Sequence, residues 1–267
     1  SVEKNIYVVG NLEAYQTISS IIKNECKFPS SAAYSRVDDE NSIARLQQKI
    51  TQAKKQTRPK IYFAPLKQSN QAQIRLGSTH LTDNTTPHAH ELSLLASGIL
   101  GGGFTSKLIQ ELRVKRGLTY SAGAAARFEK LFGRSLMVTS TKTATTLEAL
   151  TVIKDILFSL NNERKLEEKE FQKGKDKLSG SYLFSIEGST ELAMTLMSYE
   201  HKNLGVDNLS RFPAILQSLD ASSLLNKMQE LFSWEKQTIL IMGDNAILEQ
   251  LENLGNVELI KDYEKFL

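Results

Sequence analysis

The stretch Leu100–Tyr120, LGGGFTSKLIQELRVKRGLTY, combines three consecutive glycines, a short basic helical pattern, a fourth glycine and a tyrosine. A glycine-rich loop ahead of a helix is typical of phosphate binding. The P-loop pattern G-x-x-x-x-G-K-[ST] is not met, because Lys107 follows a serine and precedes a leucine. The dinucleotide pattern G-x-G-x-x-G also fails, since Gly101 and Gly103 lack the third glycine. The pattern favours glycines that permit close packing or a hinge.

Arg113 and Tyr120 are the second chemical feature of this stretch. Arg113 lies four residues before Gly117, and Tyr120 lies three residues after it. A helix that reverses at Gly117 into a strand can bring the two side chains together, so that a guanidinium fork and a phenolic O–H face one carbonyl or oxyanion. Two purely structural alternatives stay open at this point: an ion pair of Arg113 with Glu111 or Glu129, and a core position for Tyr120.

The histidines are a weaker candidate for a metal site. His80, His88, His90 and Glu91 lie within twelve residues, but HAHEL matches neither H-E-x-x-H nor its inverse H-x-x-E-H. Residues two apart on a helix point about 200° away from each other. We therefore expect surface histidines near a helix start and no metal ligands in this chain. The single cysteine, Cys26, cannot form an internal disulfide or a cysteine-based metal site.

Strands mixed with long helices must position these residues. The pattern predicts two strands within residues 60–81, with Pro65 confining the first to an edge or a bend, and further strands after Gly117 and within 133–143. Helices are expected from Thr86 and Pro87 through Ile99, over Thr105–Lys115, through Leu147–Leu157, over the charged run 163–184, at Thr190–Lys202, and after Asp220 as N-cap. This order predicts an α+β fold with a mostly antiparallel sheet packed by several helices.

Composition indicates an ordinary globular protein. The 267 residues include 24% charged and 40% hydrophobic side chains, with a net charge of +3. No apolar run reaches the roughly 18 residues of a membrane span. Lysine and arginine alternate along the chain with aspartate and glutamate, so nucleic acid is not an expected partner.

An internal repeat of a strand–glycine–helix pattern, which we call the echo, suggests the domain organisation. NIYVVGNLEAYQTISSII near the start and QTILIMGDNAILEQLENL near the end both read as strand, glycine, helix. We therefore interpret residues 1–30 as the closing strand and helix of a preceding homologous domain. Residues 31–59 are polar and are expected to form a linker carrying one helix. Residues 60–267 are then the main domain.

The stretch ILGGGFTSKLIQELRVKRGLTYSAGA closely resembles the signature of the pitrilysin-like zinc peptidases, which include insulin-degrading enzyme and the mitochondrial processing peptidase. The resemblance extends to QAQIRLGSTH, the charged helix around Glu168–Lys177, SLDASSLLNKMQELF and TILIMGD, in the family's order. It covers most of residues 60–255. The chain has no H-x-x-E-H, so the resemblance implies the inactive, metal-free half of such a peptidase.

The resemblance assigns roles that the residues alone do not. It implies that Arg113 and Tyr120 hold the substrate backbone and stabilise the tetrahedral intermediate, that Gly101, Gly102, Gly103 and Phe104 form a chamber wall, and that zinc belongs to a homologous partner subunit or half. Unfolded peptides are the implied substrates, and the chain is expected to be inactive alone. The rivals are a non-proteolytic scaffold of the same fold, as in the respiratory cytochrome bc complex, and a peptide-binding subunit. A bacterial periplasmic location and a cytoplasmic one are both compatible with the resemblance.

Overall fold

The computed structural model describes residues 9, 20, 40–82, 86–129, 131–252 and 254–260. The first copy of the echo, Cys26 and the segment interpreted as a preceding domain therefore fall almost entirely outside the described residues. The proposed domain boundaries stay a prediction. Within the linker, a helix is present at α2 (Glu40–Lys54), as expected.

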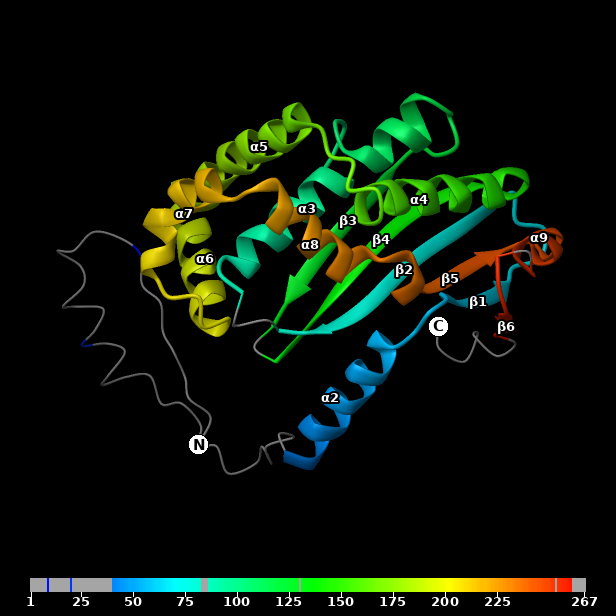
Figure 1. Cartoon of the computed structure of the whole chain (residues 1–267), viewed down its shortest axis with the longest axis horizontal. Helices are drawn as coiled ribbons and strands as arrows, with labels where there is room; N and C mark the ends of the chain where they lie inside the picture. Colours follow the sequence, from blue (N-terminus) through cyan, green and yellow to red (C-terminus); the bar gives the residue numbers. More distant parts are fainter. Residues whose placement is uncertain are drawn as a thin grey trace.

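The described strands form one mixed sheet (Figure 1). Its order is β3-β4-β2-β5-β1-β6, where the strands are β1 (Lys60–Pro65), β2 (Gln71–Leu81), β3 (Ala122–Phe128), β4 (Phe132–Lys142), β5 (Thr238–Gly243) and β6 (Val257–Leu259). The pairings of β2 with β4 and β5, and of β3 with β4, are antiparallel, whereas β1 runs parallel to β5 and β6. The α+β prediction is confirmed, with a parallel portion at one side of the sheet.

Helices follow and separate these strands. They are α3 (Ala89–Gly101), α4 (Thr146–Asn161), α5 (Glu168–Glu187), α6 (Ser189–His201), α7 (Asp207–Ser218), α8 (Ala221–Phe232) and α9 (Leu248–Glu252), with a π-helical turn η1 (Ile109–Val114) and 3-10 turns η2 (Thr143–Thr145), η3 (Trp234–Lys236) and η4 (Asn245–Ile247). Figure 1 shows α3, α4 and α8 along the sheet and α5 beyond α3, while α2 stands apart from them. No described helix is long and apolar enough to span a membrane.

One face of the sheet forms the core with these helices. Alternate residues of β2, Ile74 and Leu76, are fully buried, as are Ile239 and Ile241 of β5. They belong to one hydrophobic cluster with helical residues such as Leu95 and with many others from α3, α4 and α8. The alternation explains why the other face of the same strands stays accessible.

Three helix predictions need correction. The helix expected from Thr86 begins at Ala89, because the chain turns at His88, whose φ of 57° is left-handed. The helix expected over Thr105–Lys115 is present over residues 107–114, but it is π-helical from Ile109 to Val114. Helix α7 was not expected, and Pro213 lies inside it.

The structure confirms the predicted helix cap at Asp220 and contradicts the sheet-edge alternative for Pro65. Asp220 does cap α8: its carboxylate accepts a hydrogen bond from the Ser223 N–H at 2.8 Å. Pro65 does not place β1 at a sheet edge, since β1 lies between β5 and β6. Pro65 is instead the last residue of β1, beyond the segment that pairs with β6, so its missing N–H interrupts no pairing with that strand.

Candidate functional site

Arg113 lies beside both Tyr120 and Phe104. Its guanidinium carbon is 4.7 Å from the centre of the Tyr120 ring and 4.9 Å from that of Phe104. Both rings are largely in solvent, Tyr120 at 81% and Phe104 at 67% exposed. The prediction that the chain reversal brings Arg113 and Tyr120 side by side is confirmed as geometry. Cation–π contacts of this kind restrict where the guanidinium can lie.

The reversal at Gly117 is built from backbone hydrogen bonds. Gly117 has φ 64°, and its N–H donates to the Arg113 carbonyl at 3.0 Å. The next residue, Leu118, donates to Leu112 at 2.7 Å, and both of these leucine side chains are buried. A left-handed residue at this position ends a helix, and glycine adopts that conformation with the least strain. The reversal is therefore fixed to the core on both sides of Arg113.

The turn that carries Arg113 is π-helical from Ile109 to Val114. The Lys115 N–H donates to the Gln110 carbonyl at 3.0 Å, five residues back, and the Gln110 side chain donates to the Phe104 carbonyl at 2.6 Å. A π-turn rotates side chains relative to an α-helix and is frequent at functional sites. Here it coincides with the arginine of interest, and the Gln110 amide ties the Phe104 loop to it.

Tyr120 lies between two residues anchored on β4. The Thr139 hydroxyl donates to Thr119 Oγ1 and to the Ser121 carbonyl, both at 3.0 Å. The Thr141 hydroxyl donates to the Leu118 carbonyl at 2.7 Å. Tyr120 itself is exposed, so the alternative of a core tyrosine is wrong. The sequence did not predict that these threonines anchor the Tyr120 loop, because only the pairing of β3 with β4 brings them to it.

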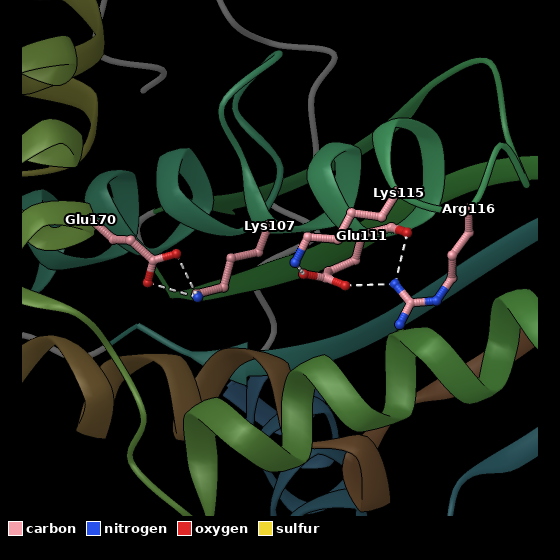
Figure 2. A network of polar contacts seen from close by, with 5 residues as sticks. All are labelled: Lys107, Glu111, Lys115, Arg116 and Glu170. Atoms are coloured by element: carbon pink, nitrogen blue, oxygen red, sulfur yellow. Dashed lines mark hydrogen bonds and ion pairs between the residues drawn. The ribbon is translucent and has the colours of Figure 1, made fainter.

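Glu111 does not pair with Arg113. Its carboxylate pairs instead with Lys115 at 2.5 Å and Arg116 at 2.6 Å, as Figure 2 shows. Desolvation raises the pKa of Glu111 and these two hydrogen bonds lower it, with a net downward shift. Glu129, the other carboxylate considered, lies 3.2 Å from His201.

The Arg113 guanidinium and the Tyr120 hydroxyl therefore keep their donors available. Among the described residues, no ion pair or side-chain hydrogen bond uses either group. On the same turn, Lys107 is 2.7 Å from Glu170 of α5 (Figure 2). That ion pair ties the start of the turn to the helical layer.

The three glycines are required by close contacts or by backbone conformation. A Cβ on Gly101 would lie 1.9 Å from the Ala124 nitrogen of β3, and one on Gly102 would lie 2.7 Å from Gly98 backbone atoms. Gly103 has φ 95°, a backbone conformation that residues with a side chain rarely adopt. The interpretation as close-packing residues is confirmed for Gly101 and Gly102, whereas Gly103 is required by its backbone conformation. The Lys177 ammonium also donates to the Gly102 carbonyl, so α5 covers this loop.

The histidines do not converge. His80 is buried and hydrogen-bonded to Ser78 at 2.9 Å and Ser135 at 3.0 Å, whereas His88 precedes α3 and is exposed. In the part of the chain that the structure describes, no three His, Cys, Asp or Glu side chains are placed to share a metal ion.

His90 was expected on the surface, but it is half-buried. It lines a cavity of about 410 Å³ together with Glu91 and Lys202, and its ring packs edge-on against Tyr199 at 6.0 Å. Burial and the nearby Lys202 lower its pKa from 6.5 to about 4. His90 is therefore neutral at neutral pH.

This pKa shift predicts acid lability. The unfolded chain takes up a proton near pH 6.5 and folded His90 only near 4, so stability is lost as pH falls through that window, by at most about 3 kcal/mol. We expect His90→Gln to lose less stability than wild type between pH 7 and pH 4.5 in urea unfolding. His88→Gln, at an exposed position, is the control. Equal pH dependence in wild type and His90→Gln would contradict the prediction.

The mixed sheet and its helical cover form an α+β domain, from which the glycine–arginine–tyrosine turn projects Tyr120 and Phe104 into solvent. The chain belongs to the M16, or pitrilysin-like, peptidase inactive domain family, because the model described as "Peptidase M16 inactive domain" matches residues 5–178. No curated protein sequence matches the chain.

Solved structures support the fold. An M16 inactive domain from Pseudomonas fluorescens is 23% identical with a TM-score of 0.63, covering 70% of this chain and 44% of that one. A Helicobacter pylori protease is 18% identical with a TM-score of 0.59, covering 70% and 45%. A chain of complex III2 from Candida albicans is 11% identical with a TM-score of 0.57, covering 72% and 46%. This chain thus spans less than half of each.

Proposed function

We propose that this chain is the metal-free half of an M16-type zinc metallopeptidase and that it supplies Arg113 and Tyr120 to a catalytic partner. The partner is a zinc-bearing homologous subunit or half, and the substrates are unfolded peptides. Membership of the inactive domain family supports the part of this proposal that describes the chain as metal-free. The assignment of a catalytic task to this chain is our inference.

The observation that carries the proposal is the placement of Arg113 beside Tyr120. The Gly117 reversal holds the backbone that carries both residues, their side chains contact each other, and neither uses its donors within the described residues. Two preorganised donors without protein partners are suited to an oxygen on which negative charge develops. A charged guanidinium binds such an oxygen more strongly than a neutral group does.

In the paired enzyme the partner provides the metal site, and this chain provides hydrogen-bond donors for the oxyanion. Zinc bound in the partner would supply the activation of the water that attacks the peptide carbonyl. Arg113 and Tyr120 donate hydrogen bonds to the carbonyl oxygen as it becomes an oxyanion, while the backbone of the peptide lies extended in the partner's site. Phe104 packs on Arg113 and limits the positions of its guanidinium.

The proposal is tested by pairing. The full-length chain is co-expressed with an H-x-x-E-H protein from the same source, and the purified complex is assayed on a quenched peptide with and without a chelator. We expect zinc-dependent cleavage by the complex and none by either half. A stable complex that cleaves no peptide would favour a scaffold of the same fold. Failure of the two chains to form any complex, together with peptide binding by this chain, would favour a peptide-binding subunit.

Tyr120→Phe separates the hydroxyl from the ring. The variant keeps the aromatic contact with Arg113 but loses the O–H, so kcat should fall by about 10²-fold with KM little changed. Val114→Ala, at an exposed neighbour outside the stack, serves as the matched control. Unchanged kcat in Tyr120→Phe would remove the hydroxyl from the mechanism.

A further inference from the structure

The face of the sheet turned away from the core carries a cluster of cations. Strand register places Arg75 of β2, Arg127 of β3, and Arg134 and Lys142 of β4 on this face, opposite to buried neighbours such as Ile74. All four side chains are exposed or half-buried. We call this surface, made by the outward residues of β2, β3 and β4, the open sheet face.

Two of these cations face each other directly. Arg127 of β3 is the register partner of Arg134 of β4. Like charges directly opposite each other on neighbouring strands are destabilising. Thr79 of β2 is the next residue in the same row, so no carboxylate stands beside the pair within these strands.

Carboxylates are scarce on this face, and the nearest to Arg127 along the chain, Glu129 just after β3, lies 3.2 Å from His201. At the outward positions of the described strands, the single acidic residue is Glu258, on edge strand β6 at the opposite side of the sheet. None of the ion pairs among the described residues involves Arg75, Arg127, Arg134 or Lys142. Arg75 instead donates to the carbonyls of Ile74 and Thr139 at 2.9 and 3.2 Å, which holds its charge against the sheet.

Helix α2 adds to the same charge. It contacts β2, and its described side chains include the exposed cations Arg45 and Lys49. The face also has apolar side chains between its cations, Leu136 at 40% exposed and the half-buried Val138. A partner that fits this surface carries several negative charges and some apolar side chains.

We propose that the open sheet face binds acidic segments of peptide substrates. This inference rests on the proposed function, because it names the class of peptide that the metal-free half recruits. A cationic surface raises the local concentration of anionic peptides and speeds their association in a salt-dependent way. The mixture of cations with exposed leucine and valine favours a peptide over a nucleic acid, whose backbone offers charge without apolar side chains.

The test measures binding to the full-length protein without any partner. A fluorescent Glu-rich peptide that also contains leucines is compared with a counterpart in which each Glu is replaced by Lys. We expect binding of the acidic peptide alone, weakened by added salt. The double variant Arg127→Glu/Arg134→Glu should weaken it by at least about tenfold. Lys154→Glu/Lys169→Glu, the same charge change on exposed residues of α4 and α5, should leave it unchanged.

Three results would overturn the inference. They are equal binding of both peptides, equal loss in the two double variants, and tighter binding of a single-stranded oligonucleotide than of the acidic peptide. If the Arg127→Glu/Arg134→Glu protein fails to fold, Arg127→Gln/Arg134→Gln with a matched circular dichroism spectrum replaces it. A failed Arg113 assay in the paired enzyme with intact acidic-peptide binding would reject the catalytic role and leave the open sheet face as proposed.

Discussion

Replacing Arg113 by alanine is expected to lower kcat/KM of the paired enzyme by about 10³-fold. The reason is the loss of a charge-assisted donor that the fold holds beside Tyr120, with its guanidinium carbon 4.7 Å from the ring centre. Because the interaction forms with developing charge, the loss should appear in kcat more than in KM. The measurement is steady-state cleavage of a quenched peptide by the zinc-loaded complex.

The controls for Arg113 use its neighbours. Arg113→Lys keeps the charge but loses the planar fork and its ring contacts, so it should restore only part of the activity. Arg116→Ala removes a nearby arginine that is already paired with Glu111, and it should stay near wild type. If Arg113→Ala and Arg116→Ala have equal activity, the donor role is refuted. An unchanged melting temperature for Arg113→Ala shows that a fall in rate is not a fall in stability.

Gly101→Ala is expected to destabilise the domain by about 3 kcal/mol or more. The added Cβ would lie 1.9 Å from the Ala124 nitrogen and 2.5 Å from the Gly123 carbonyl carbon. Both are backbone atoms of β3, so relief requires that α3 and β3 separate. The measurement is the midpoint of urea unfolding together with the melting temperature, which should fall by roughly 2–4 °C per kcal/mol.

The same helix provides a control for Gly101. A Cβ at Gly98 would meet nothing within 4 Å, and Gly98 lies inside α3. Gly98→Ala should therefore stabilise the domain by up to about 1 kcal/mol through helix propensity. Equal effects of the two substitutions would show that the contact between α3 and β3 does not restrict Gly101.

Local patterns in the sequence predicted most of the elements and their order. Alternating apolar residues predicted β2 and β4, and helical spacing predicted α4 and α5, because these periods follow from the geometry of each element alone. Boundaries were less accurate where the backbone departs from regular geometry. The left-handed residue His88 and the π-turn at Ile109–Val114 depend on packing, and no local sequence pattern indicates them.

The sequence by itself determined the type of domain, the absence of an H-x-x-E-H motif, and the Arg113–Gly117–Tyr120 spacing, since these depend on residue identity and short-range geometry. Tertiary structure decided the surroundings of each residue. It placed Phe104 against Arg113 and paired Glu111 with Lys115 and Arg116. It also anchored the Tyr120 loop through threonines of β4. It also gathered onto one face cations that alternate with buried residues along three strands. Long-range strand pairing sets such neighbours, and residues distant in the chain carry no local signal of it.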